Sequence, residues 1–198
     1  MTDISVASDD ARPLLRQRLR DQRRSLTAQQ RRVAELRAMR HLARLGVFRQ
    51  ARRLGVYFSV DGEFSIDRIM TGAEFRNKQL YAPVLRQDSL RFAFLRDGAA
   101  LSPNRFGIPE PQGGVLLDPR FLDLVLTPLV AFDDRGVRLG MGGGYYDRCF
   151  RFLKCRSGWI KPKLIGVGYD FQRVPYIQSQ SWDVRLWCAV TDERAHLF

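Results

Sequence analysis

The fold of this chain is decided by one stretch, residues 121–148, which reads FLDLVLTPLVAFDDRGVRLGMGGGYYDR. Its first part, Leu122 to Pro128, is nearly all apolar, as expected of a central strand that is covered on both faces. Its second part places four glycines within Gly140 to Gly144, and a helical pattern follows from Tyr145 to Leu153. A buried strand, a glycine-rich loop and a helix in this order indicate an α/β unit with a phosphate-binding loop.

Short apolar runs bounded by turn residues extend this α/β pattern through the rest of the chain. A capped helix is expected to begin at Ser65 and to continue to about Arg76. With 198 residues, 45% hydrophobic content and no internal repeat or linker, the sequence predicts a single domain over residues 1–198. The further strands are predicted at Leu54 to Val60, Gln79 to Val84, Leu90 to Leu95, Lys163 to Gly168 and Arg185 to Val190.

An N-terminal helical pair is predicted ahead of the α/β region, because apolar residues recur at three- and four-residue intervals from Arg12 to Gly46. A break over Ser25 to Gln29 separates the two helices, and Thr27 with Gln30 forms a capping-box pattern. We expect the second helix to run from about Ala28 to Leu45 and to stop at the glycine that follows.

The glycine-rich loop favours phosphate binding, because a backbone without Cβ atoms can bring its N–H groups close to an anion. It is neither a Walker A loop nor G-x-G-x-x-G, since Tyr145 occupies the final position of the latter. Asp147 would repel a phosphate unless Mg²⁺ bridged them, and Arg138 and Arg148 could neutralise phosphate oxygens. The alternative is a tight strand-to-helix connection in which Asp147 only complements the helix dipole.

The strongly basic composition, a formal net charge of +12, favours anionic partners but does not choose among them. Fourteen arginines against two acidic residues, between Arg12 and Arg53, make RNA or DNA binding the leading alternative class. This segment lacks interleaved aromatic residues and any recognition motif, so nucleic acid is not expected as the primary partner. In a third hypothesis the glycine-rich loop binds the phosphates of ATP and the chain is a small-molecule kinase or ligase whose acceptor the loop does not identify.

A cytoplasmic location without membrane attachment is expected from three features of the sequence. Met1 to Asp10 has neither the basic nor the apolar region of a secretory signal. The longest apolar stretch, Leu124 to Phe132, is far shorter than the roughly 20 residues that span a bilayer. Three cysteines without CxxC pairs fit reduced thiols rather than a disulfide scaffold or a zinc site.

The string Arg138 to Arg148, preceded by Thr127 to Asp133, closely resembles the signature of the 5-formyltetrahydrofolate cyclo-ligase family, also called methenyltetrahydrofolate synthetases. Further matches occur in the expected order along nearly the whole chain. They are Arg12 and Arg16 on an early helix, the turn Tyr57 to Glu63, the segment Phe106 to Pro111, and Asp183 ahead of a last strand closed by Thr191.

The resemblance implies an α/β fold with a central, mostly parallel sheet and helices on both faces. It also implies ATP- and Mg²⁺-dependent cyclisation of 5-formyltetrahydrofolate to 5,10-methenyltetrahydrofolate, with release of ADP and phosphate. In this reaction the formyl oxygen attacks the γ-phosphate, N10 attacks the activated carbon, and phosphate leaves. We expect a monomer, and the basic surface could attract polyglutamylated folate.

The resemblance assigns roles to residues of this sequence. Nucleotide binding falls on Arg12, Arg16, Arg138, Leu139, Gly140, Met141, Gly142, Gly143, Gly144, Tyr145 and Tyr146. Folate binding falls on Phe58, Glu63, Met141, Gly142, Gly143, Gly144 and Tyr145. Catalysis falls on Arg138, Tyr145 and Arg148, and the metal on Asp147 and Asp183.

Two positions depart from the common family pattern. Many members carry His where this chain has Trp182, and many carry Lys where it has Gly143. The second departure removes a cation from the loop, so Arg138, Arg148 and Mg²⁺ would carry more of the charge. Glu110 belongs to the signature but receives no role from the sequence.

Overall fold

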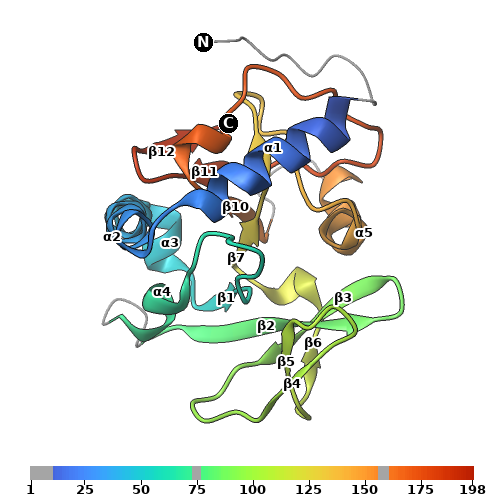
Figure 1. Cartoon of the computed structure of the whole chain (residues 1–198). Coiled ribbons are helices and arrows are strands. Elements are labelled where there is room, and N and C mark those ends of the chain that lie inside the picture. The colour runs from blue at the N-terminus through green and yellow to red at the C-terminus, as the bar shows by residue number, and fades with distance from the viewer. Residues whose placement is uncertain (1–10, 73–76, 156–160) are drawn as a thin grey trace.

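The computed structural model describes residues 11–72, 77–155 and 161–198. Its main element is a mixed eight-stranded sheet in the order β12-β11-β10-β7-β1-β2-β3-β6 (Figure 1). The α/β prediction is therefore confirmed. The strands of this sheet are β1 Arg53–Gly55, β2 Gln79–Arg86, β3 Ser89–Phe94, β6 Leu116–Leu117, β7 Leu124–Pro128, β10 Lys163–Val167, β11 Cys188–Val190 and β12 Ala195–Leu197.

The middle of the sheet is parallel. Strands β11, β10, β7, β1 and β2 pair in parallel with their successive neighbours. β12 at one end, and β3 and β6 at the other, are antiparallel. The expectation of a mostly parallel central sheet is confirmed. Two short antiparallel pairs lie outside it, β4 Leu101–Pro103 with β5 Pro109–Pro111, and β8 Ala131–Phe132 with β9 Arg138–Leu139.

Helices cover both faces of the parallel region (Figure 1). Successive residues of β7 point to opposite faces, so Leu124 and Leu126 join one core cluster and Val125 joins another. The first cluster also contains residues of α2 and α3, and the second contains residues of α5. The helices are α1 Ala11–Ser25, α2 Ala28–Arg44, α3 Gly46–Gln50, α4 Asp67–Thr71 and α5 Tyr145–Phe150, with 3₁₀ turns at Pro119–Phe121, Arg151–Cys155 and Asp170–Gln172.

The N-terminal helical pair is present, and its capping box is confirmed. Thr27 Oγ1 accepts from the Gln30 N–H at 3.2 Å, and Gln30 Oε1 accepts from the Thr27 N–H at 2.8 Å. The expected glycine stop was wrong in its mechanism. α2 ends through an extended cap at Leu45, and Gly46 begins α3 rather than taking a left-handed capping conformation.

Other predicted elements differ in length, and the strand expected over Arg185 to Val190 spans Cys188–Val190. The strand expected over Leu54 to Val60 ends at Gly55, because the chain then leaves the sheet to line a pocket. The helix expected over Tyr145 to Leu153 is α-helical only to Phe150 and continues as a 3₁₀ helix. The helix expected to reach Arg76 spans Asp67–Thr71. Residues 73–76 lie outside the described part of the chain, and so do residues 1–10, on which the prediction about a secretory signal rests.

Within the described ranges, no helix is both long and apolar enough to cross a membrane.

The strand order places a reversal point between β1 and β7. From β1 the chain moves to β2 on one side, whereas from β7 it moves to β10 on the other. Clefts for ligands form outside the carboxyl ends of parallel strands at such a reversal. The segments that leave β1 and β7 at this point are Val56 to Glu63 and Leu129 to Val130.

Candidate active site

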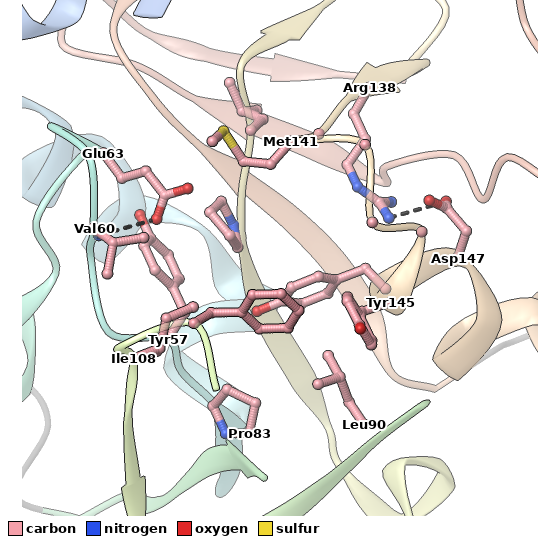
Figure 2. A pocket seen from close by; sticks show the side chains of 18 of the residues that line it. Tyr57, Val60, Glu63, Pro83, Leu90, Ile108, Arg138, Met141, Tyr145 and Asp147 are labelled. Atoms are coloured by element: carbon pink, nitrogen blue, oxygen red, sulfur yellow. Dashed lines mark hydrogen bonds and ion pairs between the residues drawn. The ribbon is translucent and has the colours of Figure 1, made fainter. Parts of the chain in front are cut away.

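A pocket of about 250 Å³ lies at the carboxyl ends of β1 and β7. Of the site residues predicted from sequence, Arg148 alone is not part of its lining. Figure 2 shows Glu63 on one side of this pocket and the Arg138–Asp147 pair on another. The predicted residues that it brings together are Arg12, Arg16, Phe58, Glu63, Arg138, Leu139, Gly140, Met141, Gly142, Gly143, Gly144, Tyr145, Tyr146, Asp147 and Asp183.

The glycine-rich loop joins β9 to α5 and forms one wall of the pocket. Gly142 and Gly144 have φ values of +104° and +65°, a left-handed backbone that favours glycine. Across the described ranges, the N–H groups of residues 140–144 donate to no acceptor. A pocket wall of successive unpaired amides suits an anion. α5 has only six residues, so these amides would contribute more to binding an anion than the helix dipole that the sequence suggested.

Three arginines surround the loop. Arg16 donates from Nε to the Gly140 carbonyl at 2.9 Å, and Arg12, one helical turn earlier on α1, pairs with Asp183 at 3.2 Å. Burial first, and then the nearby Arg12, lower the pKa of the Arg16 guanidinium. A bound anion would offset both effects. Arg138 is 7% exposed and donates to the Val184 carbonyl at 2.9 Å.

The two predicted metal ligands lie next to each other. Asp147 Oδ1 accepts from Arg138 at 3.0 Å and from the Val184 N–H at 3.1 Å, directly beside Asp183. Asp183 Oδ2 accepts from Arg12 and from the Gln180 N–H. Among the described residues, the second oxygen of each carboxylate has no hydrogen-bond partner, so each could offer one oxygen to a cation. These residues do not form a complete protein cage, since no group of three or more His, Cys, Asp or Glu is gathered in the described ranges.

Glu63 is a buried carboxylate on the opposite wall. Its side chain accepts from the Val60 N–H at 3.2 Å, as Figure 2 shows. Burial raises the pKa of Glu63 to about 7, although the Val60 N–H and the Arg23 guanidinium act in the opposite direction. The group therefore titrates near neutral pH and could either accept or donate a hydrogen bond to a ligand.

The turn that carries Glu63 is held by arginines of α1. Asp61 and Gly62 have φ values of +53° and +72°, and the Glu63 N–H donates to the Val60 carbonyl at 2.9 Å, as in a tight turn. Burial alone would raise the pKa of Asp61, but hydrogen bonds from three arginines lower it to about 2. These are Arg20 and Arg23 on Oδ2 at 2.7 and 2.8 Å, and Arg24 on Oδ1 at 2.6 Å.

Aromatic and apolar groups line the floor and the rim. Phe58 is half-buried at the start of the Glu63 turn. The Tyr145 ring makes an edge contact with Phe106 at 5.8 Å between centroids, and Phe106 and Trp182 are 55% and 62% exposed. A flat aromatic ligand could stack against this surface.

Glu110 acquires a structural role that sequence reasoning missed. Its Oε1 accepts from the Leu85 N–H and from Asn104 Nδ2, both at 2.8 Å. Asn104 Oδ1 in turn accepts from the N–H groups of Phe106 and Ile108. Glu110 therefore ties the β4–β5 hairpin to β2 and fixes the Phe106 side of the pocket. The motif signalled that Glu110 matters, but its partners are far away in sequence.

Arg148 acts from behind the loop. It donates to the carbonyls of Gly143, at 2.7 Å, and of Asp88, and its guanidinium lies 4.9 Å from the Tyr145 ring centroid. It lines a second pocket instead. In this geometry Arg148 supports the shape of the loop, and its predicted catalytic role stays a prediction.

The site combines a cleft at a strand-order reversal with a loop of main-chain amides, flanking arginines and adjacent carboxylates. This combination is typical of α/β enzymes that bind phosphate-bearing ligands. Comparison with known proteins narrows this class to one family. The profile of the 5-formyltetrahydrofolate cyclo-ligase family matches residues 8–192, and the chain belongs to this family. It is therefore a ligase of folate metabolism, and the resemblance seen in the sequence is confirmed.

Individual relatives agree with this assignment. A 5-formyltetrahydrofolate cyclo-ligase of Haemophilus influenzae is 38% identical over 183 residues, which cover 89% of this chain and 95% of its own length. The protein of that name from Escherichia coli K12 is 33% identical over 183 residues, covering 89% and 97%. The NMR structure of Aquifex aeolicus 5,10-methenyltetrahydrofolate synthetase matches with a TM-score of 0.81 at 26% identity, covering 94% of this chain and 92% of that one.

The raised pKa of Glu63 predicts a pH-dependent effect of Glu63→Gln on stability. Below pH 4.5 the carboxyl is neutral in both states, whereas between pH 4.5 and about 7 the unfolded chain ionises more readily than the folded chain. The free energy of unfolding of the wild type therefore falls as the pH rises through this range, whereas that of Glu63→Gln does not, because glutamine does not ionise. The advantage of the variant should grow by roughly 1–3 kcal/mol between pH 4 and pH 8.

Urea unfolding at the two pH values measures this difference. Glu193→Gln is the control, because that glutamate is exposed, and its difference from wild type should not vary with pH in this way. A Glu63→Gln advantage equal at both pH values would contradict the titration near neutrality.

Proposed function

We propose that the chain catalyses the ATP-dependent conversion of 5-formyltetrahydrofolate to 5,10-methenyltetrahydrofolate, with release of ADP and phosphate. One observation carries the proposal. One pocket presents on one wall arginines and loop amides that have no acceptor among the described residues, which suits a triphosphate, and on the other wall a buried carboxylate with aromatic rings, which suits a pterin. Family membership and the names of the relatives agree with this division.

The chemistry requires activation, because a formamide oxygen is a poor leaving group. In the first step the formyl oxygen bonds to the γ-phosphorus and ADP leaves. In the second step N10 bonds to the formyl carbon, the carbon–oxygen bond breaks, and phosphate carries away the oxygen while N10 loses its proton. Phosphoryl transfer asks the protein chiefly for positioning and charge compensation, which the amides of residues 140–144, Arg16 and Arg138 supply.

The folate half of the proposal assigns the pterin to the Glu63 wall. An ionised Glu63 would accept hydrogen bonds from ring N–H groups, and Phe58 would offer stacking surface. Tyr145 directly follows the loop and lines the same pocket, and its hydroxyl accepts from Arg105 at 2.6 Å. This position suits a residue that contacts both substrates.

Asp147 and Asp183 are the residues that would hold Mg²⁺. One available oxygen on each of two neighbouring carboxylates fits an ion that usually takes one or two carboxylates and completes its shell with phosphate oxygens and water. When bound, Mg²⁺ would neutralise phosphate charge during transfer. Arg138 and Arg12, already paired with these carboxylates, hold them in place.

Two alternatives receive less support from the structure. Several arginines of α1 that suggested a nucleic-acid surface are engaged within the fold, among them Arg16, Arg20 and Arg23. A different acceptor for the activated phosphate would not explain why the wall facing the loop carries Glu63 and Phe58.

Three finer statements stay predictions: a cytoplasmic location, a monomer of one domain over residues 1–198, and the use of polyglutamylated folate. The three cysteines are free thiols, which agrees with a reducing compartment. The second pocket, lined by Arg86, Arg91, Arg120, Arg148 and Arg151 together with Asp88 and Asp118, has an excess of positive charge that would suit an anionic substrate tail.

The direct test mixes the purified chain with ATP, MgCl₂ and 5-formyltetrahydrofolate and follows the near-ultraviolet absorbance of the methenyl product. We expect product to form only when nucleotide and folate are both present, with one ADP released per product. ADP release without the absorbance change would favour another acceptor. A salt-sensitive gel shift with neither signal would favour nucleic-acid binding.

Asp147→Asn should raise the Mg²⁺ concentration that gives half-maximal turnover by at least about tenfold, a loss that even outer-shell partners of a metal produce. Asparagine can still accept from Arg138 and the Val184 N–H, so the melting temperature should change little. Turnover over a Mg²⁺ titration measures the effect. Asp134→Asn, in an exposed pair with Arg173, is the control, and equal Mg²⁺ dependence in both variants would remove Asp147 from the metal site.

Gly142→Val should weaken nucleotide affinity by at least about tenfold, because valine is strained at a φ of +104° and the loop amides would turn away from the phosphates. Calorimetric titration with a non-hydrolysable ATP analogue measures this affinity. The matched control is Gly98→Val, where φ is +71° but the position lies outside the pocket. Nucleotide affinity that is unchanged in Gly142→Val would place the triphosphate elsewhere.

A further inference from the structure

Arg23 is a completely buried cation that does not line the pocket. It lies in the last turn of α1, and its exposure is 0%. A guanidinium stays charged at all physiological pH values, so its burial is costly unless its donors are satisfied. The groups that satisfy it come from both walls of the pocket.

We call the side of the pocket that carries Glu63 the folate wall and the side that carries the glycine-rich loop the nucleotide wall. On the folate wall, Arg23 holds the turn before Glu63 through two hydrogen bonds. Nε donates to the Asp61 carbonyl at 2.9 Å, and Nη2 donates to Asp61 Oδ2 at 2.8 Å. This fork fixes the turn by its main chain and its side chain together. The Arg23 carbonyl also accepts from Arg31, whose other nitrogen donates to the Gly62 carbonyl at 3.1 Å.

On the nucleotide wall, the same guanidinium reaches two further groups. Nη1 lies 3.5 Å from the carbonyl of Leu129, the residue that follows β7. Nη2 lies 3.7 Å from the sulfur of Met141, in the glycine-rich loop. Both contacts are longer and weaker than those to Asp61, but they come from the elements that carry the anion site. Figure 2 shows Met141 between Glu63 and Arg138.

We propose that Arg23 is a positioning residue of the ligase reaction: it sets the separation between the Glu63 turn and the glycine-rich loop, so that the formyl oxygen lies in line with the γ-phosphate. This inference rests on the proposed function. A buried ion pair contributes little net stability, whereas it can fix a geometry that apolar side chains would leave variable. A misplacement of about 1 Å between reacting groups can cost about 100-fold in rate.

A second effect follows from the charge. Among the described residues, the titratable groups that interact with Glu63 are Arg23, Asp61, Tyr57 and Tyr146. Of these four, Arg23 carries the positive charge, which stabilises the ionised Glu63 carboxylate. Loss of the Arg23 charge should raise the pKa of Glu63 further. The pH dependence of kcat/KM for the folate substrate therefore reports on Arg23 in a way that stability does not.

The test compares Arg23→Met and Arg23→Lys with Arg24→Met. Arg24 binds the same aspartate through Oδ1, but its side chain is 48% exposed and it makes no contact with Leu129 or Met141. In Arg23→Met, Asp61 keeps Arg20 and Arg24, so the turn retains counter-charges. Each variant is assayed at saturating ATP and 5-formyltetrahydrofolate, with the folded fraction measured by circular dichroism at the assay temperature.

We expect kcat per folded molecule to fall about 100-fold in both Arg23 variants and to stay within about threefold of wild type in Arg24→Met. The acid limb of kcat/KM for folate should move to higher pH in Arg23→Met, and should stay near its wild-type position in Arg23→Lys, which keeps the charge but not the fork.

Folded Arg23 variants with turnover like that of Arg24→Met would overturn the proposal. Failure of both Arg23 variants to fold would also overturn it, because Arg23 would then serve stability alone. If the wild-type chain itself forms no methenyl product, the proposed function fails, and that result is distinct from either of the others.

Discussion

The parallel pairing of β1 with β7 is the constraint on which the rest of the structure depends. In the register of this pair, Leu54 lies opposite Leu124 and Gly55 opposite Val125, so both strands end at the same edge of the sheet. Because neighbouring connections then leave in opposite directions, the segment to Glu63 and the segment to the glycine-rich loop face each other across a cleft. The two substrate walls are therefore a product of topology before any side chain contributes.

Side chains of α1 convert this cleft into a site with a defined shape. Arg16 binds the loop, Arg20 and Arg24 bind the Asp61 turn, and Arg23 reaches both walls from the interior. The helix itself is anchored by Leu15 and Leu19, which pack against residues on either side of the β8–β9 hairpin. The arginines of α1 thus stabilise the fold itself, because their guanidinium groups donate hydrogen bonds to main-chain carbonyls and to carboxylates.

The sequence predicted the α/β class, the helical pair and the capping box at Thr27, because each depends on local periodicity or on residues within one turn. Through the resemblance it also predicted a set of site residues that, Arg148 excepted, all line the pocket, but it assigned no site role to other lining residues such as Pro83, Leu90 and Leu129. Prediction from the sequence failed where a residue contacts a partner that is far away along the chain. Nothing near Arg23 in the chain indicates that Asp61 and Met141 surround it, and nothing in the apolar run after Gly55 indicates that the chain leaves the sheet there to line a pocket. Short pairs such as β8–β9 leave too few residues for a periodicity to show.

The amides of residues 140–144, which donate to no acceptor in the described part of the chain, have a consequence for how the proposed site responds to acidity. Main-chain N–H groups do not titrate and guanidinium groups keep their charge, so the protein groups proposed to meet the triphosphate do not change their charge in the physiological pH range. The opposite wall depends on a carboxyl group that gains its proton near neutrality. On the proposed assignment, in which an ionised Glu63 accepts from the pterin, a modest acidification would change the charge of the folate side of the site and leave that of the loop side unchanged.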